Sequence, residues 1–136
     1  MTGLRGRWET IQHGPDIPDV ICDTGHNAHG IKWVGEQIDR ISCDYETVWF
    51  ILGLSNDKNL SEIIRYLPRN VRYVATQASS ARAKDAVEIA NALTDEGFNC
   101  SMERPVSQAY LNTLGKAGPK DLVFVGGSNF VVAEIL

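Results

Sequence analysis

Apolar runs and helical patterns alternate along the chain. Four short runs are rich in residues that favour β-structure, and they predict strands that are covered on both faces. These runs are residues 20–22, 48–52, 71–75 and 122–125. Apolar residues at helical spacing follow the runs and predict helices. The helical stretches are residues 28–41, 60–67, 83–96, 106–117 and 130–136.

Weaker signals complete the pattern. Residues 7–11 and 98–102 are expected to form short strands, and residues 13–19, which contain two prolines, are expected to form a loop. Gly97 stands where a C-cap glycine is expected after the helix at 83–96. The alternation of strands and helices predicts an α/β fold, with a Rossmann-like, mostly parallel sheet and helices on both faces.

Composition narrows the function classes. The chain has 136 residues, the size of one domain with a core of its own, and its net charge of −4 argues against a nucleic-acid-binding surface. No apolar run approaches the roughly 20 residues that span a bilayer, and no signal-peptide pattern opens the chain. Three irregularly spaced cysteines, Cys22, Cys43 and Cys100, indicate reduced thiols rather than disulfides or a zinc site. We therefore expect a cytoplasmic protein with no nucleic-acid or membrane partner.

Polar loops follow four of the predicted strands. They are residues 23–27, 53–59, 76–82 and 126–129. In a parallel sheet such loops meet at the carboxyl ends of the strands, where open α/β folds bind their ligands. The helix N-termini that follow carry unpaired N–H groups and a partial positive charge, which favour phosphates and carboxylates. The sequence therefore predicts a ligand site at this end of the sheet.

Each of these polar residues also has a purely structural interpretation. Asn27 and Asn59 are well placed as N-caps whatever the function. His26 alone is as consistent with a structural histidine as with a ligand-binding one. The pair Gly126-Gly127 alone is as consistent with a tight turn. Asp23 lies several residues ahead of the helix, so a cap role suits it less well than it suits Asn27.

The stretch Asp23-Thr24-Gly25 matches the motif of aspartic proteases, but those enzymes need a mostly β domain and two such carboxylates. Here a single copy precedes a helix. The chain also lacks the pattern G-x-x-x-x-G-K-[S/T] and has no G-x-G-x-x-G after its first buried strand. If ATP is bound, another domain must hold most of its phosphates.

Several stretches together resemble the C-terminal domain of folylpolyglutamate synthase/dihydrofolate synthase, a branch of the Mur ligase superfamily. The family pattern is a Gly-Arg-aromatic strand, then D-x-[A/G]-H-N, then G-x-x-x-D-K-D and G-S-x-x-x-V-A-E. The matching stretches are Gly6-Arg7-Trp8, Ile21-Cys22-Asp23-Thr24-Gly25-His26-Asn27, Gly53–Lys58 and Val125–Glu134. They occur in the family's order and run from Gly6 to the end of the chain.

The resemblance implies an ATP-dependent amide ligase that adds L-glutamate to folate or dihydropteroate through an acyl phosphate. It implies ATP and Mg²⁺ as cofactors, held mainly by a larger N-terminal P-loop domain that this chain lacks. Residues 1–136 would then be a single glutamate ligase domain, inactive in isolation, whose partner is its own N-terminal domain. Its small-molecule substrates would be ATP, glutamate and folate or dihydropteroate.

The resemblance also implies roles for individual residues. It assigns a catalytic role to His26, nucleotide contacts to Arg7, Asp23, Asn27 and Ser128, and substrate contacts to Asp57 and Lys58. An arginine can bind phosphate through charge-assisted hydrogen bonds, whereas a carboxylate more plausibly accepts from ribose hydroxyls. We expect Asp23→Ala to weaken ATP use and to leave folding nearly intact.

Two departures and two alternatives accompany this interpretation. The family's usual alanine is Gly25 here, a small residue that should loosen the turn without abolishing it. The start at Met1-Thr2-Gly3 resembles an expression boundary of an excised domain. A Mur peptidoglycan ligase domain fits the C-terminal stretch less well than the folate branch does. A non-catalytic α/β module that binds a nucleotide or a protein is the alternative from another class.

Overall fold

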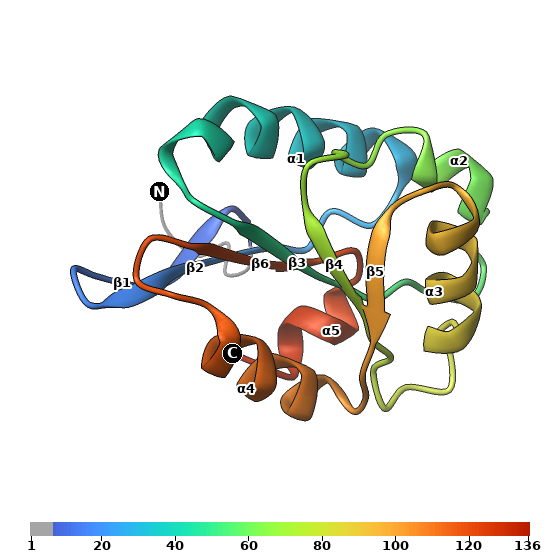
Figure 1. Ribbon diagram of the computed structural model, residues 1–136. Coiled ribbons are helices and arrows are strands. Elements are labelled where there is room, and N and C mark those ends of the chain that lie inside the picture. Colours follow the sequence, from blue (N-terminus) through green and yellow to red (C-terminus); the bar gives the residue numbers. More distant parts are fainter. Residues whose placement is uncertain (1–6) are drawn as a thin grey trace.

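Six strands form one sheet in the computed structural model, which describes residues 7–136 (Figure 1). The strands are β1 (Glu9–Gly14), β2 (Ile17–Asp23), β3 (Val48–Leu52), β4 (Arg72–Ala75), β5 (Asn99–Met102) and β6 (Leu122–Gly126). Their order across the sheet is β1-β2-β6-β3-β4-β5. Only β1 is antiparallel to its neighbour; every other pair is parallel. The predicted α/β fold with a mostly parallel sheet is therefore confirmed.

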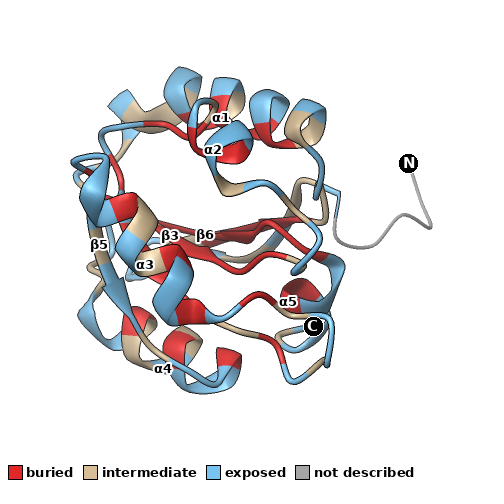
Figure 2. Cartoon of the chain, turned by 90° about the vertical axis from the view of Figure 1, so that its right-hand side faces the viewer, coloured by how far each residue is buried: buried red, intermediate tan, exposed pale blue. Residues whose placement is uncertain are grey.

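Helices cover both faces of the sheet. They are α1 (Ala28–Ile41), α2 (Leu60–Ile64), α3 (Ala86–Asp95), α4 (Val106–Lys116) and α5 (Asn129–Ala133), with a short 3₁₀ turn η1 (Ser42–Asp44) after α1. Figure 1 shows α1, α2 and α3 on one side of the strands and α4 and α5 on the other. Figure 2 shows the buried residues on the strands and on the inward sides of the helices.

The two faces bury different side chains. Beneath α1, α2 and α3 the core is aromatic: the rings of Phe50 and Tyr73 stack at 5.2 Å, and Phe124 meets Phe50 edge-on at 4.8 Å. Beneath α4 and α5 the core consists mainly of valine and alanine, such as Val123 and Ala109. Chain direction explains the division, because the connections from β2 to β5 advance across one face and α4 returns across the other.

Several element boundaries agree with those predicted from the sequence, and others do not. The helix at 28–41 and the strand at 48–52 occur as predicted, and Gly97 ends α3 with φ of +86°. The expected loop at 13–19 is instead a hairpin: β2 begins at Ile17, which pairs with Gly14. The hairpin is irregular, with register shifts on both sides of Gln12, and this tolerates Pro18 at the start of β2.

Three helices are clearly shorter than predicted. α5 ends at Ala133 rather than at residue 136, and the other two differences have identifiable reasons. α2 ends at Ile64, and the amides of Tyr66 and Leu67 make tighter i→i+3 bonds, because the residue before Pro68 avoids helical backbone. α3 begins at Ala86 rather than residue 83, because Ala83 is paired with Ser55 in an isolated β-bridge.

None of the helices in residues 7–136 is long and apolar enough to cross a membrane. Gly6 of the first family stretch lies outside the described residues.

Candidate functional site

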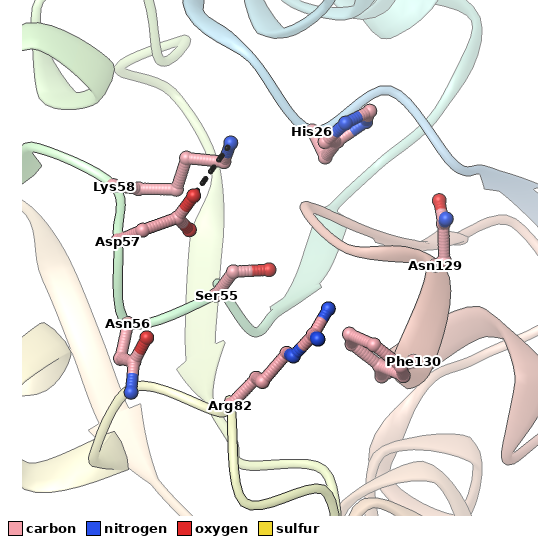
Figure 3. Close-up of a pocket in the computed structure, with 8 residues that line it drawn as sticks. All are labelled: His26, Ser55, Asn56, Asp57, Lys58, Arg82, Asn129 and Phe130. Carbon is pink, nitrogen blue, oxygen red and sulfur yellow. Dashed lines mark ion pairs between the residues drawn. The ribbon is translucent and has the colours of Figure 1, made fainter.

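A cleft of about 430 Å³ opens where β2, β3, β4 and β6 end (Figure 3). The residues that line it are His26, Ser55, Asn56, Asp57, Lys58, Arg82, Asn129 and Phe130. They come from the loops after β2, β3 and β4 and from the start of α5, which follows β6, so the segments after the four strands do converge as predicted. Of the site residues predicted from the sequence, His26, Asp57 and Lys58 line the cleft.

Glycines let the ends of β3 and β6 approach closely beneath the cleft. The Gly53 amide donates to the carbonyl oxygen of Gly126 at 3.2 Å. Gly127 has φ of +101°, and a Cβ added there would lie only 2.3 Å from the Gly53 carbonyl oxygen. A side chain at Gly53 would likewise collide with Val131, at 2.4 Å. Gly127 is therefore required by backbone contact and left-handed geometry, whereas Gly53 is required by the close approach of the Val131 side chain.

The loop after β3 is fixed by the loop after β4. Ser55 forms a β-bridge with Ala83, and the Asn56 amide donates to the Arg82 carbonyl oxygen at 2.6 Å. Lys84 is only 7% exposed, and its Nζ reaches the Asn56 carbonyl oxygen at 3.5 Å. These contacts make one rigid wall, from which the Ser55 and Arg82 side chains extend toward the middle of the cleft in Figure 3.

The cleft is rich in cationic and hydrogen-bonding groups that have few protein partners. Lys58 makes one ion pair, at 3.7 Å to the exposed Asp57 carboxylate. Within residues 7–136, no carboxylate lies within 4.0 Å of the Arg82 guanidinium. His26 is exposed and faces the same space from the loop after β2 (Figure 3). Such groups can bind an anion through charge-assisted hydrogen bonds.

Asn27 and Ser128 shape the cleft as helix caps. The Asn27 side-chain oxygen accepts from the Gly30 amide at 2.8 Å at the start of α1. Ser128 is 2% exposed, and its Oγ accepts from the Phe130 amide at 3.0 Å at the start of α5. The predicted cap role of Asn27 is confirmed. Neither Asn27 nor Ser128 lines the cleft itself. Asn129 and Phe130, the two residues after Ser128, do.

Asp23 does not line the cleft and is 3% exposed. Its Oδ1 accepts from the Gly25 amide at 2.7 Å, and its Oδ2 accepts from the Trp8 amide at 2.9 Å. Trp8 has φ of +45°, so the carboxylate holds a left-handed residue next to the exposed Arg7. Arg7 does not line the cleft either. The expectation that Asp23→Ala leaves folding intact does not fit these contacts, because the substitution would leave two amides without their acceptor.

Sequence reasoning did not single out Ser55, Asn56, Arg82, Asn129 or Phe130. Each lies in or directly after a polar loop that follows a strand, so the loop positions carried the signal. What the residue pattern did not reveal was the β-bridge that turns Arg82 into the cleft. Within residues 7–136, no three His, Cys, Asp or Glu side chains come together as a metal site.

The Mur ligase, glutamate ligase domain family matches residues 6–129. The chain therefore belongs to this family. One relative is the dihydrofolate synthase/folylpolyglutamate synthase of Buchnera aphidicola, 28% identical over 98% of this chain and 31% of its own. Another is the probable bifunctional folylpolyglutamate synthase/dihydropteroate synthase of Halobacterium salinarum, 32% identical over 95% of this chain and 15% of its own. The chain thus spans a third or less of these relatives.

Solved structures share the fold. Bifunctional folylpolyglutamate synthase/dihydrofolate synthase of Yersinia pestis, complexed with AMPPNP and Mn ion, has a TM-score of 0.82 at 22% identity. E. coli FolC in complex with ADP has a TM-score of 0.84 at 23% identity. The similarity covers 98% and 97% of this chain, and 30% of each of those chains. The chain therefore has the fold of the C-terminal domain of these solved structures.

Proposed function

We propose that this chain is the C-terminal domain of an ATP-dependent ligase that adds L-glutamate to folate or dihydropteroate. The observation that carries the proposal is the cleft into which His26, Lys58 and Arg82 project from three different loops. Convergent cationic and hydrogen-bonding groups suit a reaction in which ATP phosphorylates a carboxylate and an amino acid attacks the acyl phosphate. The folate names of the relatives favour this branch over peptidoglycan ligases.

The cleft residues would act on the charged parts of the reactants. Lys58 and Arg82 are suited to hold phosphate or carboxylate oxygens, and Asp57 orients Lys58 through their ion pair. His26 is placed to hydrogen-bond the transferred phosphoryl group or the incoming amine. Asn27 and Ser128 fix the two helix N-termini that border the cleft.

Arg7 and Asp23 would help to bind the nucleotide from beside the cleft. Asp23 holds the backbone of Trp8, and we assign it the role of positioning Arg7 for a phosphate contact. A direct contact of Asp23 with the ribose stays a prediction. Mg²⁺ and most contacts to ATP would come from a P-loop domain of the longer protein. A cytoplasmic location suits cysteines held in the reduced, thiol form.

The test measures ATP-dependent transfer of labelled L-glutamate to dihydropteroate by the full-length protein that contains this domain. Arg82→Gln should lower kcat/KM roughly 10- to 100-fold, because it removes a charge-assisted hydrogen bond of about 1.5–3 kcal/mol. Arg65→Gln makes the same charge change outside the cleft and should have little effect. The 136-residue chain alone should be inactive.

Three results would contradict the proposal. Ligation by the chain alone would show that no P-loop domain is needed. Equal activities of the Arg82→Gln and Arg65→Gln proteins would remove the cleft from the reaction. Use of a peptidoglycan precursor in place of dihydropteroate would assign the domain to the other branch of the superfamily.

A further inference from the structure

Glu134 ends the stretch that resembles the family pattern G-S-x-x-x-V-A-E, and the proposed reaction gives it no role. It is the residue that caps the C-terminal end of α5. A carboxylate at that end of a helix faces the negative end of the helix dipole, so α5 gains no stability from it. The side chain of Glu134 instead contacts a different segment, the loop after β4.

Two hydrogen bonds join Glu134 to this loop. Its Oε2 accepts from the backbone amide of Ser79 at 2.7 Å and from the Ser79 hydroxyl at 2.9 Å. Hydrogen bonds to an ionised carboxylate are stronger than those between neutral groups. The end of α5 is therefore tied to the loop after β4.

A tight turn connects this contact with Arg82, which lines the cleft. The Arg82 amide donates to the Ser80 hydroxyl oxygen at 3.1 Å, which closes the turn between Ser79 and Arg82. On the other side, the Asn56 amide donates to the Arg82 carbonyl oxygen at 2.6 Å. The backbone at Arg82 is thus held from two sides, by the loop after β3 and by Glu134 through Ser79.

Glu134 also belongs to the helix that forms another wall of the same cleft. Asn129 and Phe130, at the start of α5, line the cleft, and Figure 3 shows the Arg82 side chain pointing toward the side on which Phe130 lies. A helix of five residues is not stable by itself, so the contacts at its two ends fix its place. Ser128 caps the start of α5, and Glu134 binds the loop at its end.

We propose that Glu134 is a positioning residue, which sets where the Arg82 guanidinium lies relative to the start of α5. The inference rests on the proposed function, in which Arg82 holds a phosphate or carboxylate oxygen of the reactants. Glu134 does not line the cleft, so it acts through the loop after β4. A displaced guanidinium would stabilise the charge that develops during the transfer less well, because that stabilisation depends on geometry fixed before the reaction.

The first test follows the ¹⁵N-labelled 136-residue chain by NMR without any substrate. Glu134→Ala should speed hydrogen exchange of the Ser79 amide about tenfold and increase the motion of the Arg82 Nε–H group. Glu134→Gln keeps an oxygen acceptor at the same reach and should restore most of the protection. The control Glu36→Ala removes an exposed carboxylate from α1 and should leave both measurements unchanged.

The second test is a double-mutant cycle on ATP-dependent glutamate ligation by the full-length protein that contains this domain. Glu134→Ala should lower kcat/KM roughly five- to tenfold, whereas Glu134→Gln should stay close to the unaltered protein. In the Arg82→Gln background, Glu134→Ala should change kcat/KM less than about twofold, because its effect passes through Arg82. A contact that only stabilises the fold would give the same loss in both backgrounds.

Three results would overturn the positioning role. They are unchanged Ser79 exchange in the Glu134→Ala chain, equal effects of Glu134→Ala and Glu36→Ala, and additive losses in the cycle. Failure of the proposed function looks different: Arg82→Gln would leave ligation unchanged, while the NMR measurements would still decide whether Glu134 fixes Arg82. If Glu134→Ala prevents folding, Ser79→Ala, which removes only the hydroxyl bond, carries both tests.

Discussion

The two ends of the sheet both carry many polar side chains, but these side chains are paired differently. At the amino-terminal end, Asp19 accepts from the Tyr45 hydroxyl at 2.6 Å and lies 2.6 Å from His13 Nδ1. At the carboxyl-terminal end, Lys58 and Arg82 face a cleft with little or no pairing to carboxylates. Side chains that hold the fold are therefore recognised by their hydrogen bonds and ion pairs within the protein, and side chains available to a ligand by the lack of them. The end of the sheet at which a side chain lies does not by itself distinguish the two groups.

Each end also contains exceptions that make the comparison useful. Asp23 belongs to the carboxyl-terminal end, yet both of its oxygens are occupied by backbone amides. Arg69 and Arg72 belong to the amino-terminal end, yet neither is paired with a carboxylate in residues 7–136. The comparison predicts that substitutions of paired groups change stability, whereas substitutions of unpaired groups change binding.

The largest effect is expected where backbone meets backbone. Gly127→Ala should cost about 3 kcal/mol of stability or more, because it combines left-handed strain with a Cβ 2.3 Å from the Gly53 carbonyl oxygen. Urea denaturation measures the loss. Gly115→Ala is the control: its Cβ would meet nothing within 4 Å, so the substitution should stabilise α4 slightly. Similar free energies of unfolding for the two variants would contradict the role given to Gly127.

A smaller loss is expected at Asp23. Asp23→Ala should cost roughly 2–3 kcal/mol, because the Trp8 and Gly25 amides lose their acceptor. Asp95→Ala, at the exposed end of α3, should change stability by less than about 0.5 kcal/mol. A melting temperature of the Asp23→Ala chain equal to that of the unaltered chain would show that the carboxylate does not hold the left-handed residue.

A pH-dependent effect is expected at Asp19. Partial burial raises the pKa of Asp19, but hydrogen bonds from Tyr45 and His13 outweigh it and hold the pKa below the usual 3.8. The contribution to stability is therefore present above pH 3.8 and is lost as pH falls through the lower pKa of the folded state. Asp19→Asn should flatten the acid limb of a plot of melting temperature against pH. The exposed Asp16→Asn should leave that limb unchanged.

The smallest change in stability is expected for the side chains that face the cleft. Lys58→Met and Arg82→Gln should each shift the free energy of unfolding by less than about 0.5 kcal/mol. Within residues 7–136, Arg82 has no carboxylate within 4.0 Å, and Lys58 loses only a 3.7 Å ion pair with the exposed Asp57, which is worth little. The same variants should bind nucleotide more weakly, as followed by chemical shifts on addition of ATP. A large loss of stability with unchanged binding would reverse the comparison for this end of the sheet.

The sequence predicts the fold well wherever one segment contains the whole signal. The helix at 28–41 and the strand at 48–52 follow from their own apolar patterns. The start of β2 does not, because residues 17–19 become a strand only through pairing with β1. The start of α3 was predicted wrongly for a similar reason: Ala83 forms a β-bridge with Ser55, which lies 28 residues earlier in the chain.

The site divides in the same way. The positions of His26, Asp57 and Lys58 after their strands are enough to predict that they meet. The direction of the Asp23 side chain is not predictable from its own motif, because one of its donors is the amide of Trp8 in another segment. Arg82 lies well past the end of β4, and only the contact between two loops brings it back to the cleft.

The irregular β1 and the short β5 have a further consequence, since they are the two outer strands of the sheet. β5 has four residues, Asn99 to Met102, and β1 shifts register on both sides of Gln12. Long, regular outer strands invite backbone pairing with other molecules and so promote aggregation. Both outer strands here are poor templates for such pairing, so we expect the sheet not to extend from one molecule to the next at high concentration.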